Sequence, residues 1–106
     1  MEYTHLGRSG LLVSRICLGT MNFGPETPET DSHSIMDSAH AAGINFFDTA
    51  NVYGGKPGEG ITEQIVGRWF AQGGGRREKT VLATKMFGSM GDWPNERYCS
   101  ALNIRR

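Results

Sequence analysis

The chain has 106 residues, about the size of one domain, which is in principle long enough to bury a hydrophobic core. Its 11 basic and 11 acidic residues cancel to a formal net charge of +0 at pH 7, and no block of like charge stands out, so the composition favours neither nucleic acid nor an anionic membrane as a partner. The N-terminus has no basic segment followed by an apolar run, and no stretch reaches the roughly 18 apolar residues of a membrane helix. We therefore expect a cytoplasmic protein without a membrane segment, and the binding of a neutral or small polar ligand stays open.

The cysteines and histidines form no recognisable metal site. Cys17 and Cys99 fit neither a metal-binding spacing nor a disulfide framework. Because free cysteines are mostly core residues, we expect both to be buried or inert thiols in a reducing compartment. His5, His33 and His40 lack partners at a ligand spacing, and we expect surface or helix-packing roles for them and no metal.

The N-terminal segment predicts a small β-hairpin. Two short apolar stretches flank the turn residues 7–10, which read GRSG. A strand is expected to follow at Arg15–Gly19, and Gly19 and Gly24 then enclose a loop. The hairpin should therefore lead directly into the first strand of the main fold.

The segment TDSHSIMDSAHAAG predicts an amphipathic helix with small residues toward the core. Thr30 or Asp31 is the expected N-cap, and Gly43 stands where the helix would end. Apolar residues recur at helical spacing and are expected on the core side: Ile35, Met36, Ala39 and Ala42.

A second strand and a second helix follow. The strand is expected at Ile44–Ala50, and the glycine-rich residues 54–60 form a loop after it. The helix is expected at Thr62–Ala71, with Glu63 on a solvated face. Its apolar residues at helical spacing are Ile65, Val66, Trp69 and Phe70.

The rest of the chain predicts a third strand and the beginning of a third helix. Glycines 73–75 end the second helix, and TVLATKMF, Thr80–Phe87, is apolar and β-branched enough for a strand covered on both faces. A third helix is expected to begin from Asn95 or Ser100. Alternating strands and helices predict parallel strands joined by right-handed crossovers, which is an α/β architecture.

Polar residues stand near the carboxyl ends of the apolar strands. The two-residue side-chain period places Asp48 on one face of its strand with Phe46, and Lys85 on one face of its strand with Val81. On neighbouring parallel strands such an acid and base can meet inside the structure. In α/β sheets and barrels, ligands bind beyond the carboxyl ends of the strands, where Tyr53 is also expected.

The three residue types together indicate acid and base chemistry. A phenol is a useful proton donor only if its pKa, ordinarily about 10, is brought toward neutrality, and a nearby ammonium in a water-poor pocket does this by favouring the phenolate. A buried ion pair alone is a weak reason to keep charges in strands, because desolvation usually costs more than pairing returns. We therefore expect Asp48 to hold and orient Lys85 while Tyr53 donates a proton to a substrate oxygen.

Three motifs resemble those of the aldo-keto reductases: GTMNFG at 19–24, NFFDTANVYG at 45–54 and VLATK at 81–85. The resemblance covers essentially the whole chain. It implies a (β/α)8 barrel that uses NADPH to reduce aldehydes and ketones, a small-molecule carbonyl being the substrate. It also implies Tyr53 as the general acid, with Lys85 and Asp48 as its catalytic partners.

The resemblance also implies a cofactor site. Gly19, Thr20 and Met21 match the loop after the first barrel strand that approaches the cofactor, together with Asp48. Family members bind the dinucleotide without a Rossmann fingerprint, and no G-x-G-x-x-G or Walker sequence occurs here.

Part of the family pattern is not found in residues 1–106. The family places a catalytic histidine at the end of the fourth strand and holds the cofactor phosphates in its seventh and eighth βα segments. A closed barrel needs about 250 residues, so we expect residues 1–106 to be the N-terminal part of one barrel domain, truncated in the third helix, and to be aggregation-prone alone.

Two alternatives stay open for function, and two possible roles stay open for a group of apolar residues near the site. The chain resembles nucleotide-binding subunits associated with channels as well as enzymes, and a non-functional remnant is the other alternative. Near the site, four apolar residues either line a substrate pocket or cover the barrel rim: Met86, Phe87, Met90 and Trp93.

Overall fold

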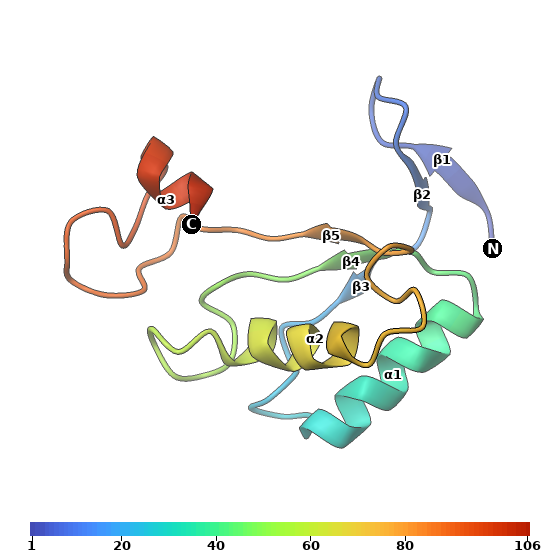
Figure 1. Ribbon diagram of the computed structural model, residues 1–106, viewed down its shortest axis with the longest axis horizontal. Helices are drawn as coiled ribbons and strands as arrows, with labels where there is room; N and C mark the ends of the chain where they lie inside the picture. The colour runs from blue at the N-terminus through green and yellow to red at the C-terminus, as the bar shows by residue number, and fades with distance from the viewer.

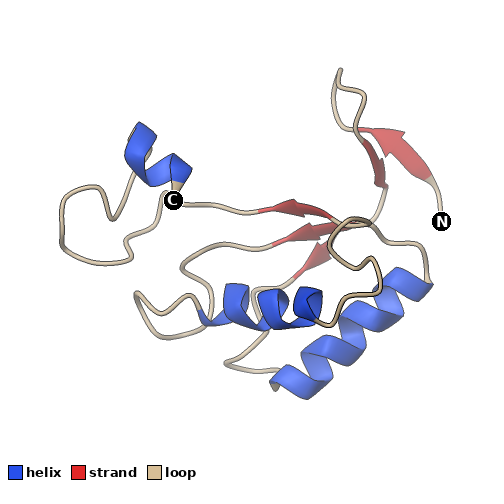
Figure 2. Ribbon diagram, viewed as in Figure 1, coloured by secondary structure: helices blue, strands red, loops and turns tan.

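A sheet of parallel strands forms the centre of the fold in the computed structural model, which describes residues 1–106 (Figures 1 and 2). The strands β3 (Leu18–Gly19), β4 (Phe46–Asp48) and β5 (Val81–Ala83) lie in the order β3-β4-β5, and both pairings are parallel. The alternation of parallel strands with helices is therefore confirmed. The sheet is open, with β3 and β5 at its edges, and does not close into a barrel.

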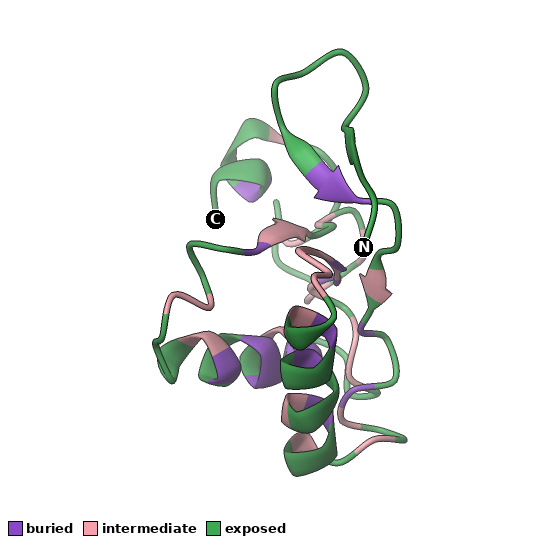
Figure 3. Ribbon diagram, turned by 90° about the vertical axis from the view of Figure 1, so that its right-hand side faces the viewer, coloured by how far each residue is buried: buried purple, intermediate pink, exposed green.

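Helices α1 (Glu29–Ala41) and α2 (Ile61–Ala71) pack on one face of this sheet, below it in Figure 1. Figure 3 shows buried stretches, in purple, recurring along both helices while the outer loops are exposed. Apolar residues from both helices, β4 and the loop after β3 form a single core: Phe23, Met36, Ala39, Phe47, Ile65, Val66 and Trp69.

Helix α1 differs from its prediction at its first residue and in part of its buried side. It begins at Glu29 after Pro28, whose φ of −57° suits the entry to a helix, and not after Thr30 or Asp31. Two acidic residues in the first turn suit the positive end of the helix dipole. The buried residues are Ser32, Met36 and Ala39; the expected core residues Ile35 and Ala42 are exposed.

Helix α2 follows its prediction closely. It starts one residue early, at Ile61, after Gly60 in the left-handed conformation with φ of 63°. Trp69 is fully buried and lies against Phe47 of β4 and Phe70, with ring centroids 5.6 and 5.4 Å apart. The periodic apolar side chains thus decide which side of α2 faces the sheet.

The N-terminal hairpin is confirmed, with β1 (Tyr3–His5) antiparallel to β2 (Leu12–Ser14). It stands at the end of the sheet where the strands begin (Figure 1). The Tyr3 hydroxyl donates to the carbonyl of Gly43 at 2.7 Å, and the amide of Ser14 donates to Asn45 Oδ1 at 2.7 Å. These bonds join the hairpin to the segment between α1 and β4.

The main strands are shorter than predicted, because regular ladder pairing ends before the apolar runs do and only single backbone hydrogen bonds continue beyond it. The run expected at Arg15–Gly19 forms a strand only at Leu18–Gly19, and the run at Thr80–Phe87 only at Val81–Ala83. A further short helix, α3 (Ala101–Arg105), begins after Ser100, whose side chain accepts from the amide of Asn103 at 3.2 Å. Of the two expected N-caps, Ser100 is therefore the one used.

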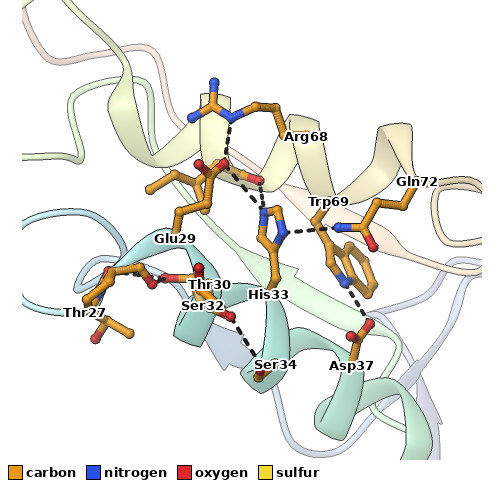
Figure 4. A network of polar contacts seen from close by, with 12 residues as sticks. Thr27, Glu29, Thr30, Ser32, His33, Ser34, Asp37, Arg68, Trp69 and Gln72 are labelled. Atoms are coloured by element: carbon orange, nitrogen blue, oxygen red, sulfur yellow. Dashed lines mark hydrogen bonds and ion pairs between the residues drawn. The ribbon is translucent and has the colours of Figure 1, made fainter.

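Polar contacts also join α1 to α2 (Figure 4). Arg68 donates to the Glu29 carboxylate, and Gln72 Nε2 donates to His33 Nδ1 at 3.0 Å. Since Nδ1 of His33 accepts, its Nε2 carries the proton and donates to the carbonyl of Ile65 at 3.0 Å. His33 is therefore a helix-packing residue.

His40 lies where α1 meets the core. Its ring is edge-on to Trp69, with centroids 4.8 Å apart, and its Nε2 is 2.8 Å from Thr80 Oγ1. Because Thr80 gives its own proton to the carbonyl of Arg76 at 2.7 Å, His40 donates to Thr80. Burial lowers the pKa of His40 below its ordinary value of 6.5, and the nearby positive charges of Arg76 and Lys79 lower it further.

We expect His40 to titrate below its ordinary range and to make stability depend on pH. The unfolded state binds more protons than the native state in this window, so stability is complete above about pH 6.5 and is lost as pH falls through the lowered pKa of His40. An NMR titration of the ring protons checks the pKa, with His40→Asn to assign the signal. Urea unfolding between about pH 8 and 5 should show a steeper loss for the native sequence than for His40→Asn. A midpoint at or above the ordinary value would contradict the expectation.

Candidate active site

The segments that leave the carboxyl ends of β3, β4 and β5 run to the same edge of the sheet (Figure 1). Register keeps their ends level, because Asp48 is paired with Gly19 on one side and with Ala83 on the other. Lys85 lies two residues beyond β5, and Tyr53 lies in the loop after β4. This is the edge at which α/β folds bind ligands.

The structure brings the side chains of Asp48, Tyr53 and Lys85 together. Lys85 Nζ donates to Asp48 Oδ2 at 2.7 Å, to the carbonyl of Thr49 at 2.9 Å and to Tyr53 Oη at 3.2 Å. The ammonium also lies 4.9 Å from the centroid of the tyrosine ring. Because the phenol oxygen accepts from the lysine, its own proton is free to be donated elsewhere.

The lysine is held in its charged form. Its hydrogen bond to the Asp48 carboxylate raises the pKa of Lys85 above 10.5, the bond to Tyr53 adds to this, and partial burial opposes it. Lys85 is therefore an ammonium at neutral pH. A positive charge directly beside the phenol oxygen stabilises the negative charge that forms there when the proton leaves.

The ion pair is more exposed than predicted. The side chains of Lys85 and Asp48 are 49% and 37% exposed, whereas we expected a pair inside the structure. The reason is that α1 and α2 cover only the opposite face of the sheet, which carries Phe47. Such an exposed pair adds only about 0–1 kcal/mol to stability, so it contributes little to holding the fold together.

Backbone hydrogen bonds continue beyond the strands and hold the site segments. The amide of Thr49 donates to the carbonyl of Ala83 at 2.9 Å, and the amide of Asn51 donates to the carbonyl of Lys85 at 3.1 Å. The amide of Tyr53 closes a turn onto the carbonyl of Ala50 at 3.2 Å. The turn after β4 thus carries Tyr53 back toward Lys85.

The three residues expected near a cofactor differ in what they present. Thr20 is fully buried, and both its amide and its hydroxyl donate to the carbonyl of Asp48, at 3.1 and 2.9 Å. Met21 is exposed, and no atom lies within 4 Å of the position that a Cβ on Gly19 would occupy. The open space beside Gly19 and the side chain of Met21 are therefore the parts that a ligand can meet.

A cavity of about 430 Å³ adjoins the lysine, between the loop after β4, the start of α2, the segment after β5 and α3. Met86 and Met90 line it, as one of our two alternatives expected. Phe87 and Trp93 do not line it and are exposed on the loop before α3. Two of the four residues thus line this cavity and two do not.

Both cysteines are exposed, so of the two expected alternatives, buried or inert thiols, the first is excluded. Leu18 packs toward the core, and the alternation of side chains turns the preceding Cys17 to the uncovered face of the sheet. The surrounding protein and the negative charge of Asp48 raise the pKa of the Cys17 thiol. A thiol held in its protonated form has low reactivity, which agrees with the expectation of an inert group.

Sequence reasoning did not find the contact that Glu63 makes. Instead of pointing to solvent, its carboxylate accepts a hydrogen bond from the hydroxyl of Thr84 and lines the cavity. Arg68, five residues further on, pairs instead with Glu29 of α1. No spacing pattern marks the contact between Glu63 and Thr84, because it joins residues from different elements.

No helix in the structure combines the length and apolar character needed to cross a membrane.

The chain is similar to several known proteins. The chain is 58% identical over 110 residues to the uncharacterized oxidoreductase YrpG of Bacillus subtilis, and the match covers all of the chain and 34% of that protein. It is 43% identical to the protein tas of Escherichia coli, over 83% of the chain and 26% of that protein. It is 36% identical to a probable voltage-gated potassium channel subunit beta of Oryza sativa, over 98% of the chain and 30% of that protein.

The chain thus spans about a third or less of the length of these relatives. The sequence model of one family matches residues 15–106, which include every residue of the site. This protein belongs to the aldo/keto reductase family.

Proposed function

We propose that this chain supplies the proton-donating part of an NADPH-dependent reductase of aldehydes or ketones. One observation carries the proposal: the Lys85 ammonium lies between the Asp48 carboxylate at 2.7 Å and the Tyr53 phenol at 3.2 Å. A charged lysine at this distance prepares the phenol to give up its proton. The free thiols of Cys17 and Cys99 suit a cytoplasmic location.

The residues of this chain fit the reactive end of the cofactor. Gly19 leaves open space, Met21 is exposed, and Asp48, Tyr53 and Lys85 lie at the same edge of the sheet. We propose that a flat nicotinamide ring lies over this edge.

The proposed reaction transfers a hydride and a proton to a carbonyl group. When bound, the cofactor would supply a hydride to the carbonyl carbon of the substrate. As the hydride adds to carbon, the π electrons of the C=O bond move onto the oxygen. The oxygen binds the hydroxyl proton that Tyr53 donates, and the product is an alcohol. The negative charge left on the phenol oxygen faces the Lys85 ammonium, which Asp48 keeps charged and oriented.

A graft tests the proposal. The 110-residue segment of the Bacillus subtilis relative that matches this chain is replaced by residues 1–106, and the product is called the grafted protein below. We expect it to oxidise NADPH in the presence of aldehydes or ketones at a rate within about tenfold of the unmodified relative, about 1.4 kcal/mol in barrier height. Omitting the carbonyl compound is the control. Loss of carbonyl reduction in a grafted protein that still folds and binds NADPH would contradict the proposal.

Residues 1–106 by themselves are expected to show essentially no reductase activity. The ion pair that must act on the phenol is partly exposed, and one face of the sheet has no cover, so water screens the charges. Absorbance of NADPH with a panel of aldehydes checks this. Oxidation by the 106-residue chain at the rate of the grafted protein would refute it.

A second candidate function is a nucleotide-binding subunit that regulates a channel. The relative of Oryza sativa named a probable channel subunit beta matches 98% of this chain, which favours keeping this candidate. It predicts cofactor binding without a need for the Tyr53 proton. The two functions are therefore separated by turnover: the enzyme loses it when only that hydroxyl is removed, whereas the regulatory subunit binds the cofactor and has no turnover to lose.

A further inference from the structure

The first turn of α2 contacts the segments that follow all three strands. The hydroxyl of Thr62, fully buried, donates to the carbonyl of Phe23 at 2.7 Å in the loop after β3. The amide of Thr62 donates to the carbonyl of Tyr53 at 3.2 Å, after β4. The neighbouring Glu63 accepts from Thr84, after β5. One helical turn thus touches every segment that carries a residue of the candidate site.

Close packing holds this turn in place. Gly54, which directly follows Tyr53, has φ of +129°, and a Cβ added there would lie 2.5 Å from the Cβ of Ile61. Any larger residue would collide with the helix and strain the backbone. The tyrosine segment therefore lies directly against the first residue of α2.

Glu63 acts on the segment that carries the lysine. Its carboxylate holds the hydroxyl of Thr84, the residue directly before Lys85. In an extended chain, successive side chains point in opposite directions, so fixing Thr84 toward α2 turns Lys85 toward Asp48. The amide of Asn51, in the loop after β4, donates to the carbonyl of Lys85 at 3.1 Å and so holds the backbone at Lys85.

We propose that Glu63 is a positioning residue, which, by holding Thr84, directs the Lys85 side chain toward Asp48 and Tyr53. The effect of this positioning on the turnover rate rests on the function proposed above. The positioning itself is a property of this chain and is measurable without cofactor or substrate. Glu63 touches no reacting atom in this scheme.

Chemical labelling of amines measures the position of Lys85. The chain has only three lysines, so Lys56 and Lys79 are internal controls in every sample. The grafted protein, at low micromolar concentration, is treated with a limiting amount of an acetylating reagent at neutral pH, and mass spectrometry gives the rate at Lys56, Lys79 and Lys85. Only the uncharged amine reacts, and the hydrogen bond to Asp48 favours the charged form of Lys85. Asp48→Asn, which weakens this bond, gives the rate of a released lysine.

Four variants decide the outcome. Glu63→Ala and Thr84→Val both break the contact, and the second changes only a hydroxyl on an exposed residue, so it should fold even if the first does not. We expect either to raise labelling of Lys85 about threefold or more, toward the Asp48→Asn rate, with Lys56 and Lys79 unchanged. Glu63→Gln and Thr84→Ser keep an acceptor and a donor and should retain slow labelling. Gln64→Ala, which loses only a bond from Gln64 to the carbonyl of Glu59, is the matched control on the same turn.

Two results would overturn the proposal. One is unchanged labelling of Lys85 in Thr84→Val while Asp48→Asn labels faster. The other is general loosening of the fold, seen as an equal rise in labelling rate at all lysines or an equal rise of the Lys85 rate in Gln64→Ala. Neither result depends on reductase activity. If labelling follows the expectation but the grafted protein reduces no carbonyl, the proposed function fails and the positioning stands.

Discussion

Tyr53→Phe in the grafted protein is expected to lower the turnover rate roughly 10²–10⁴-fold, the usual contribution of a general acid. The change removes one oxygen atom and the proton that it carries, while the ring that lies 4.9 Å from Lys85 Nζ remains. Affinity for NADPH should stay the same, because the phenol proton is used on the substrate oxygen. Steady-state kinetics with a carbonyl substrate and a fluorescence titration with NADPH measure the two quantities separately.

The matched control for this variant is Tyr3→Phe. Tyr3 also loses its hydroxyl, with the 2.7 Å hydrogen bond that it donates to the carbonyl of Gly43, but it lies on the hairpin at the opposite end of the sheet (Figure 1). We expect its turnover to stay near that of the grafted protein. Turnover that survives Tyr53→Phe would exclude the phenol as the acid. NADPH binding without any turnover, already before this substitution, would favour the regulatory candidate.

Trp69→Ala is expected to destabilise the chain by about 3–5 kcal/mol, which is the usual cost of emptying an aromatic site in a core. Trp69 has 0% of its surface exposed, and its ring packs against Phe47 and His40. Its indole N–H donates to Asp37 at 2.9 Å, and the alanine leaves that carboxylate without this partner. Since small domains are stable by only about 5–15 kcal/mol, most of the population should unfold in mild urea.

Two further variants serve as comparisons: the first separates lost packing from the lost hydrogen bond, and the second is a control at an exposed site. Trp69→Phe keeps an aromatic ring and loses the hydrogen bond, so we expect a smaller loss, part of it the roughly 1 kcal/mol of that bond. Trp93→Ala removes the other tryptophan, which is 74% exposed, and should change stability by less than about 0.5 kcal/mol. Urea unfolding followed by circular dichroism gives the midpoints. A midpoint for Trp69→Ala equal to that of Trp93→Ala would show that α2 does not form the core described here.

The order and type of the main elements could be predicted because each has its own apolar period. The spacing of Ile65, Val66 and Trp69 identifies α2 almost to the residue, and the glycines on either side agree with its ends. Strand lengths could not be predicted in the same way. The run Thr80–Phe87 is mostly apolar, but regular ladder pairing covers only Val81–Ala83, and this pairing depends on where β4 ends.

The helix α1 shows a different limit. Its apolar residues include Ile35, which is exposed, and its buried residues include Ser32, whose hydroxyl donates to the carbonyl of Pro28 at 2.9 Å. A polar side chain that satisfies its own hydrogen bond within the helix can be buried, and hydropathy does not show this. Which side of a helix with a weak apolar stripe faces the core is therefore decided by the surface against which it packs.

The sequence by itself determined the order of strands and helices, the hairpin, and the places of Asp48 and Lys85 near strand ends, because these depend on local periodicity and on glycine and proline. Only the tertiary structure decided that Tyr53 turns back onto Lys85, that Glu63 binds Thr84, and that the ion pair and Cys17 lie on an uncovered face. The physical reason is that these features depend on contacts between residues far apart in the chain, and on which face of the sheet the two helices cover.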